Sequence, residues 1–232
     1  MGATVRALDS FPSCPCGGRW VPLCHLQFVA WVLLAAAAPV GAGELSIGLD
    51  DGHGHPVADA VVTLHKEGGE PIPRETMTKT IDQRDETFLP YVEIFRPGDQ
   101  VVFRNSDRTR HHVYSFAPAK TFEFVIAPGD SSPPITLDHV GEISVGCNIH
   151  DQMITHLYVS DAPWVSRSGA DGRVDFKQLP AGAYHLEVWH PQLRPGRAGP
   201  HQDIAVNDAP QSVTFSLSLL PDPRQTGDRA RY

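Results

Sequence analysis

Short runs of β-branched and aromatic residues, separated by turns, recur along most of this chain. Leu45 to Leu49 alternates between apolar and polar positions. Further short runs rich in β-branched and aromatic residues are AVVTLH (60–65), FLPYVEIF (88–95) and VVFR (101–104). The sequence holds 21 Pro and 20 Gly, which favour tight turns over long helices. No long helical period is present. This spacing of strands and turns predicts an all-β chain built as a Greek-key barrel or sandwich.

The N-terminus differs from the rest of the chain. Leu26 to Ala38 reads LQFVAWVLLAAAA, with Arg6 and Arg19 before it and the small residues of 40–42 after it. An apolar run of this length suits a signal-peptide core better than a bilayer span. We therefore predict a signal peptide at 1–42 and a periplasmic or secreted mature protein. A retained membrane anchor is the alternative, but no stop-transfer pattern of charges follows.

Net charge and cysteine content limit the kinds of partner and disulfide that the mature protein can have. The whole chain has a formal net charge of −8, and removal of Arg6, Asp9 and Arg19 makes the mature part slightly more acidic. Acidity argues against nucleic acid as a partner. We expect a monomer with no stable membrane span after signal cleavage. Cleavage also leaves Cys147 as the only cysteine, so it cannot form an internal disulfide and needs another protection from oxidation.

The mature chain divides into two predicted β-domains. The first covers 43–162, and the second, 163–220, has its own ADG and LPAG turns between strands. This second unit resembles the carboxypeptidase regulatory-like (transthyretin-like) β-sandwich of exported proteins. A polar tail at 221–232 is expected to be disordered.

The segment GCNIHDQM, Gly146 to Met153, groups side chains that can ligate a metal. It brings Cys147, His150 and Met153 together between two strands. Taken singly, each residue has a structural explanation, since a lone cysteine is usually a small buried hydrophobe and methionine usually fills a core. Their coincidence in one loop instead points to a metal. Soft sulfur ligands with imidazole select copper, and two histidines, a cysteine and a weak axial methionine describe an electron-transfer copper site.

Upstream, PGDQVVFRNSDRTRHHV provides the missing histidine. This segment resembles the plastocyanin and pseudoazurin pattern of the cupredoxin family, and HHVYSFAPAK with GCNIHDQM is similar to exported cupredoxin-like proteins labelled methylamine utilization proteins. The resemblance implies that 43–162 is a cupredoxin domain holding one type 1 copper through His111, Cys147, His150 and Met153. Because His112 stands where the family has asparagine, the upstream ligand stays open between His111 and His112, of which only one can face the metal.

The expected function is therefore that of a non-enzymatic electron carrier between redox partner proteins, linked by the resemblance to amine oxidation. Asn105 and backbone N–H groups are expected to donate hydrogen bonds to the sulfur. A copper carrier or sensor could use the same ligands. A Cys-His hydrolase lacks a third orienting group, and a binding module is suggested only by the second unit. A dinuclear purple site lacks a second cysteine, and a structural zinc site would normally carry no methionine.

Overall fold

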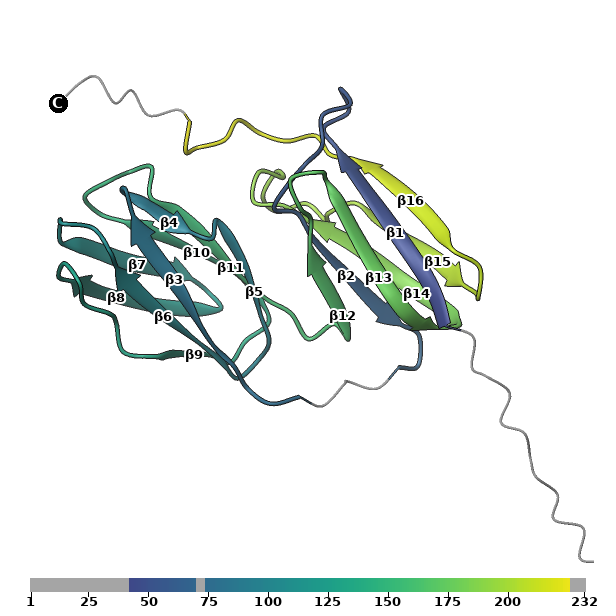
Figure 1. Cartoon of the computed structure of the whole chain (residues 1–232), viewed down its shortest axis with the longest axis horizontal. Helices are drawn as coiled ribbons and strands as arrows, with labels where there is room; N and C mark the ends of the chain where they lie inside the picture. Colours follow the sequence, from purple (N-terminus) through teal and green to yellow (C-terminus); the bar gives the residue numbers. More distant parts are fainter. Residues whose placement is uncertain (1–41, 70–73, 226–232) are drawn as a thin grey trace, which may run out of the picture. The chain divides into compact units, whose positions relative to one another are not determined.

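The computed structural model describes residues 42–69 and 74–225. Over these ranges the chain forms sixteen β-strands and no helix (Figure 1). The all-β expectation is confirmed. No helix in the described part has the length and hydropathy to cross a membrane. The predicted signal peptide at 1–42 falls almost wholly outside the described residues, as do residues 226–232 of the predicted tail.

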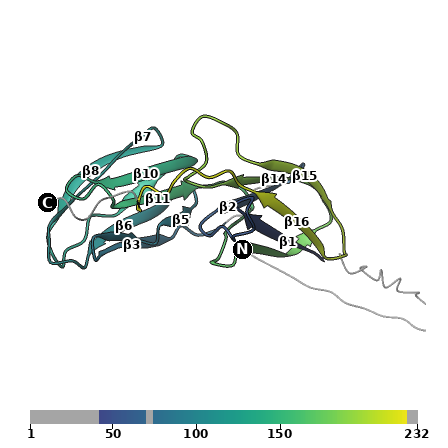
Figure 2. The same cartoon turned by 90° about the horizontal axis from the view of Figure 1, so that it is seen from above.

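One β-sandwich is built from the middle of the chain. Its five-stranded sheet has the order β5 (Val92–Phe95), β11 (Ile154–Val159), β10 (Gly141–Cys147), β7 (His111–Ala117) and β8 (Lys120–Ile126). Its four-stranded sheet has the order β4 (Thr87–Leu89), β3 (Thr78–Arg84), β6 (Asp99–Asn105) and β9 (Ile135–Leu137). The pairs β3–β6 and β5–β11 are parallel, and the other pairs are antiparallel. Figure 2 shows the two layers, with β7, β8 and β10 in one and β3 and β6 in the other.

Alternating burial along several strands helps to create the core of this sandwich. In β6 and β7 every second side chain is buried, as the two-residue period of a half-buried strand requires. The inward positions carry large apolar groups such as Phe103, Val113 and Ile143, and they pack into one cluster that also contains Cys147 and Met153. The predicted metal ligands therefore lie at the margin of a rigid apolar core.

The remaining strands form a second sandwich with a separate core. One sheet has the order β13 (Arg173–Pro180), β1 (Ala42–Asp50) and β16 (Gln211–Ser216). The other has the order β12 (Trp164–Arg167), β2 (Val61–Lys66), β14 (Gly182–Trp189) and β15 (His201–Val206). Leu45 and Ile47 of β1, Leu64 of β2 and Leu186 of β14 are buried together between these sheets.

β1 and β2 fall within the first predicted domain, 43–162, but they pair with strands that lie mostly in the second, 163–220. β1 pairs antiparallel with β13 and parallel with β16, while β2 pairs with β12 and β14. Both strands thus complete the second sandwich, and the copper-motif sandwich is inserted between β2 and β12 (Figure 1). An alternating pattern shows which face of a strand is buried but carries no information on which strand lies beside it. The likeness of this sandwich to carboxypeptidase regulatory-like domains stays a prediction.

The beginning of the predicted tail also differs from expectation. Residues 221–225 lie within the described part, where the Arg224 guanidinium lies 3.4 Å from the centroid of the Tyr91 ring. The Asp222 carboxylate accepts hydrogen bonds from the Arg224 side chain at 2.7–3.2 Å. A cation packed on an aromatic face is a favourable contact, and it anchors this stretch of chain.

Candidate metal centre

The β10–β11 loop brings the residues of the GCNIHDQM segment together. β10 ends at Cys147, whose backbone N–H donates to the carbonyl of Met153 at 3.2 Å, and the Met153 N–H donates to the carbonyl of His150 at 2.9 Å. These bonds close the loop on itself. The Cys147 thiol is unpaired and buried, with 3 % of the residue exposed, and Met153 is fully buried in the same apolar cluster. The only other methionine in the described residues, Met77, is 51 % exposed.

β7 supplies the upstream imidazole. Cys147 lies opposite Val113 in the β10–β7 register, so the first inward position of β7, His111, faces the thiol. The His111 Nδ1 atom lies 3.7 Å from the Cys147 Sγ atom. The His111 and His150 rings have a centroid distance of 5.3 Å. One ligand atom from each of His111, Cys147 and His150 can be chosen so that all lie within 4.8 Å of one another.

His112 points to the opposite face of the sheet. Its Nε2 atom is 2.7 Å from the Glu123 carboxylate and its Nδ1 atom is 3.4 Å from the Asn148 amide. The choice between the adjacent histidines is therefore decided by the pleat of β7, which turns neighbouring side chains to opposite faces. The geometry brings together His111, Cys147 and His150, with Met153 buried nearby, and leaves His112 outside.

A carboxylate fixes the orientation of the His111 ring. The Asp107 Oδ2 atom lies 2.8 Å from His111 Nε2. A carboxylate only accepts, so His111 donates this hydrogen bond from Nε2, and its Nδ1 atom faces the sulfur. Partial burial raises the pKa of the Asp107 carboxyl, but hydrogen bonds from His111 and from the backbone of Glu86 and Asp85 outweigh it and lower that pKa below its usual value. Asp107 therefore remains a carboxylate.

The second imidazole has one nitrogen without a protein partner. His150 Nδ1 is buried and makes no hydrogen bond to any described residue. His150 Nε2 lies 3.5 Å from the Glu86 carboxylate, and the side chain is 24 % exposed. An unpartnered buried nitrogen is costly unless something binds it. Its position beside the thiol fits a metal ligand, and the set of one thiolate, two imidazoles and a nearby thioether suits copper.

Two residues of the site were missed by sequence reasoning, and one was given the wrong role. Asp107 and Glu86 lie in polar turns whose sequence looks like ordinary surface, and only the fold brings them to the imidazoles. The expected donation from Asn105 to the sulfur is wrong. Its amide donates both hydrogens to backbone carbonyls, at Thr109 and Ile126, so Asn105 shapes the turn before β7 instead.

The described fold can be compared with known proteins. No protein-family model matches the sequence, and no curated protein does. Among solved structures, a purple cupredoxin from Nitrosopumilus maritimus matches 35 % of this chain and 98 % of its own, at 18 % identity and a TM-score of 0.32. An amicyanin variant in its Cu(I) form matches 36 % of this chain and 82 % of its own, at 15 % identity and a TM-score of 0.34.

A copper-containing nitrite reductase from Thermus scotoductus matches 49 % of this chain but only 28 % of its own, at 21 % identity and a TM-score of 0.33. In the inserted sandwich, the two sheets enclose an apolar core and the loop that follows Cys147 lies beside β7.

Proposed function

We propose that the inserted cupredoxin sandwich binds one type 1 copper ion through His111, Cys147, His150 and Met153 and carries single electrons between redox partner proteins. One observation carries this proposal. A buried free thiol lies within 4.8 Å of two imidazole nitrogens, and the buried nitrogen of His150 has no protein partner. Copper bound there would alternate between Cu(I) and Cu(II), which is one-electron chemistry without a substrate.

The residues around the ligands support a site whose geometry changes little. Cys147 ends a central strand, His111 begins the neighbouring one, and both side chains are buried, which restrains them. Asp107 fixes the ring of His111. The His150 side chain, partly exposed, gives a partner the shortest approach to the site. An electron carrier needs such a site, because rearrangement on each change of charge would slow transfer.

Absorption spectroscopy of the full chain loaded with Cu(II) tests the assignment. We expect an intense visible thiolate-to-copper charge-transfer band with one copper per chain, and we expect Cys147→Ser to abolish it. A colourless Cu(II) complex would contradict the electron-transfer site. A coloured protein that exchanges electrons with no periplasmic redox protein, while it passes copper to an acceptor, would favour a copper carrier instead.

The cellular setting belongs to the same proposal. A signal peptide at 1–42, export to the periplasm and a monomeric, non-enzymatic protein without a membrane span fit a diffusing carrier. The link to amine oxidation rests on the sequence resemblance alone. Reduction of the copper-loaded protein by an amine-oxidising dehydrogenase, followed in a stopped-flow spectrometer, tests that link directly.

A further inference from the structure

The turn between β3 and β4 lies beside the proposed copper site, where its Glu86 side chain approaches His150. Its central residues, Asp85 and Glu86, have φ angles of 53° and 55°. Non-glycine residues rarely adopt the left-handed region, because the Cβ atom crowds the backbone there, and two in succession are rarer still. Such a conformation persists only where the surroundings hold it.

Asp107 holds this turn. Its Oδ1 atom accepts the backbone N–H of Asp85 at 2.6 Å, and its Oδ2 atom accepts that of Glu86 at 3.1 Å. The same Oδ2 atom accepts the Nε2 proton of His111 at 2.8 Å. The Asp107 backbone N–H in turn donates to the buried side-chain oxygen of Asn105 at 2.9 Å, which fixes the carboxylate relative to β6.

The turn then reaches the other imidazole. Its Glu86 side chain places a carboxylate oxygen 3.5 Å from His150 Nε2. One carboxylate therefore contacts the first histidine directly and orders the turn whose side chain contacts the second. Among the described residues, no other side chain makes a hydrogen bond or ion pair with the Nε2 atom of either histidine.

We propose that Asp107 is the positioning residue of the copper site: it fixes His111 with its Nδ1 lone pair facing Cys147, and through the Asp85–Glu86 turn it holds Glu86 beside His150. This inference rests on the proposed copper-binding function. A carboxylate that accepts the distal N–H of a ligating imidazole makes that ring a stronger donor. A stronger donor favours Cu(II) over Cu(I), so Asp107 lowers the reduction potential of the site.

The first test uses the apoprotein and needs no copper. Nitrogen-15 NMR of the imidazole rings distinguishes a protonated Nε2 from a protonated Nδ1. We expect His111 of the wild-type apoprotein to be in the Nε2–H form, and Asp107→Ala to lose that preference. A wild-type His111 protonated on Nδ1 overturns the proposal even if every Asp107 variant fails to fold.

The second test compares Asp107→Asn with Asp85→Asn after copper loading. Both changes remove one negative charge from the two turns that meet through the Asp85 N–H to Asp107 hydrogen bond, but only the first removes a carboxylate bonded to an imidazole. Asn is also compatible with the left-handed backbone of residue 85. For Asp107→Asn we expect Cu(II) affinity to fall about 10–100-fold. Each tenfold loss of Cu(II) relative to Cu(I) affinity raises the midpoint potential by about 59 mV.

The outcomes separate this inference from the proposed function. A blue wild-type protein whose potential and Cu(II) affinity respond equally to the two substitutions would overturn the role of Asp107 and leave the copper site intact. A colourless wild-type complex would instead overturn the electron-transfer function, and the apoprotein NMR result would then decide alone whether Asp107 positions His111. Glu86→Gln is expected to shift the potential in the same direction as Asp107→Asn but less, since its carboxylate is more exposed and more distant.

Discussion

At the scale of single residues, two neighbouring histidines of β7 have opposite environments. His111 is fully buried beside the thiol, and His112 is bonded to Glu123 on the outer face. The two residues are chemically identical and adjacent in sequence. They therefore provide a matched pair for testing which face of β7 carries the metal.

We predict that His111→Ala abolishes the visible band of the copper-loaded protein and that His112→Ala retains it, because the second imidazole does not face the sulfur. Absorption and electron paramagnetic resonance spectra of both variants, at equal copper content, make the comparison. Loss of colour in His112→Ala with retention in His111→Ala would reverse the assignment of the upstream ligand.

A buried histidine of the other sandwich makes the stability depend on pH. Burial lowers the pKa of His190 to about 4, against the opposing effect of its hydrogen bond to the Ala58 carbonyl. In the unfolded chain a histidine protonates near pH 6.5. Between these values the unfolded state binds more protons than the folded state, so the free energy of unfolding falls as the pH falls from about 6.5 to about 4.

We predict that His190→Gln, which keeps a hydrogen-bond donor but cannot titrate, flattens this dependence by up to about 1.4 kcal/mol per pH unit. Urea unfolding of both proteins at several pH values between 4 and 7 measures the slope. The same substitution at the exposed His139 is the control. Equal slopes for the wild type and His190→Gln would contradict the prediction.

At the scale of strands, the alternation in β1 places Ile47 in a core that the sequence did not reveal. Ile47 is 1 % exposed and packs in the sandwich of β12–β16, whereas Ile143 of β10 is buried in the cluster of Cys147. Both described tryptophans, Trp164 of β12 and Trp189 of β14, also lie on strands of the sandwich that contains Ile47. Trp164 packs on Tyr184 within that sandwich, whereas Trp189 also contacts Tyr158 of β11, so tryptophan fluorescence reports on that sandwich and on its contact with β11.

We predict that Ile47→Ala lowers the free energy of unfolding, followed by tryptophan fluorescence, by about 2–5 kcal/mol, the usual cost of such a cavity. The charge-transfer band of the folded protein should be unchanged. Ile143→Ala, the matched control, should instead perturb the band, because its cavity opens in the core that supports Cys147. The opposite pattern of spectral changes would mean that β1 packs in the copper-binding sandwich.

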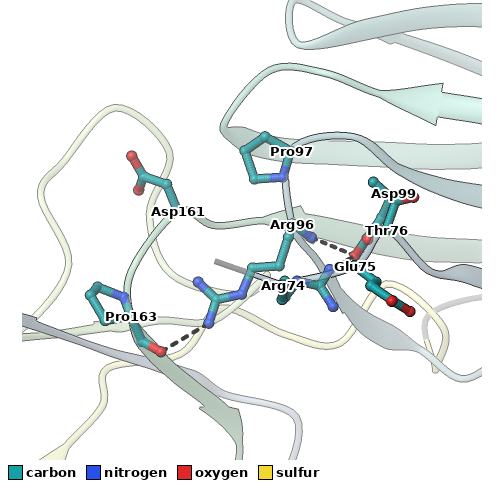
Figure 3. A pocket seen from close by; sticks show the side chains of 8 residues that line it. All are labelled: Arg74, Glu75, Thr76, Arg96, Pro97, Asp99, Asp161 and Pro163. Carbon is teal, nitrogen blue, oxygen red and sulfur yellow. Dashed lines mark hydrogen bonds and ion pairs between the residues drawn. The ribbon is translucent and has the colours of Figure 1, made fainter. Parts of the chain in front are cut away.

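At the scale of the whole molecule, the chain leaves the inserted sandwich through Ser160 to Pro163, and one arginine holds this crossing. The Arg96 guanidinium donates to the carbonyls of Ala162 and, at 3.1 Å, Pro163. Figure 3 shows Arg96 extended toward Pro163, with Asp99 on its other side. The buried Asp99 carboxylate accepts the Arg96 backbone N–H at 2.8 Å and is ion-paired with Arg74.

We predict that Arg96→Met lowers the free energy of unfolding by about 2 kcal/mol, because it leaves partly buried carbonyls of the crossing without a donor. Proteolysis between Ser160 and Pro163 should become faster at the same time. Arg104→Met, on an exposed position of β6, is the control and should leave both quantities unchanged. Equal proteolysis of the two variants would show that Arg96 does not hold the crossing.

The sequence by itself predicted the all-β fold class, which the structure confirms, and the residues of a candidate copper site. Strand periodicity is a local property, so the alternating residues of β6 and β7 identify these strands without knowledge of the strands beside them. Three of the grouped residues, Cys147, His150 and Met153, lie in one loop, so their chemistry was visible along the chain. The resemblance to cupredoxins added the upstream histidine.

The tertiary structure alone decided three further points. Strand order depends on packing between distant segments, so only the fold shows that β1 and β2 close the second sandwich around an insertion. The pleat of β7 turned His111 rather than His112 toward the thiol. Asp107 and Glu86 reached the imidazoles because separate turns meet in space, and a contact between side chains from separate turns leaves no pattern in a single sequence.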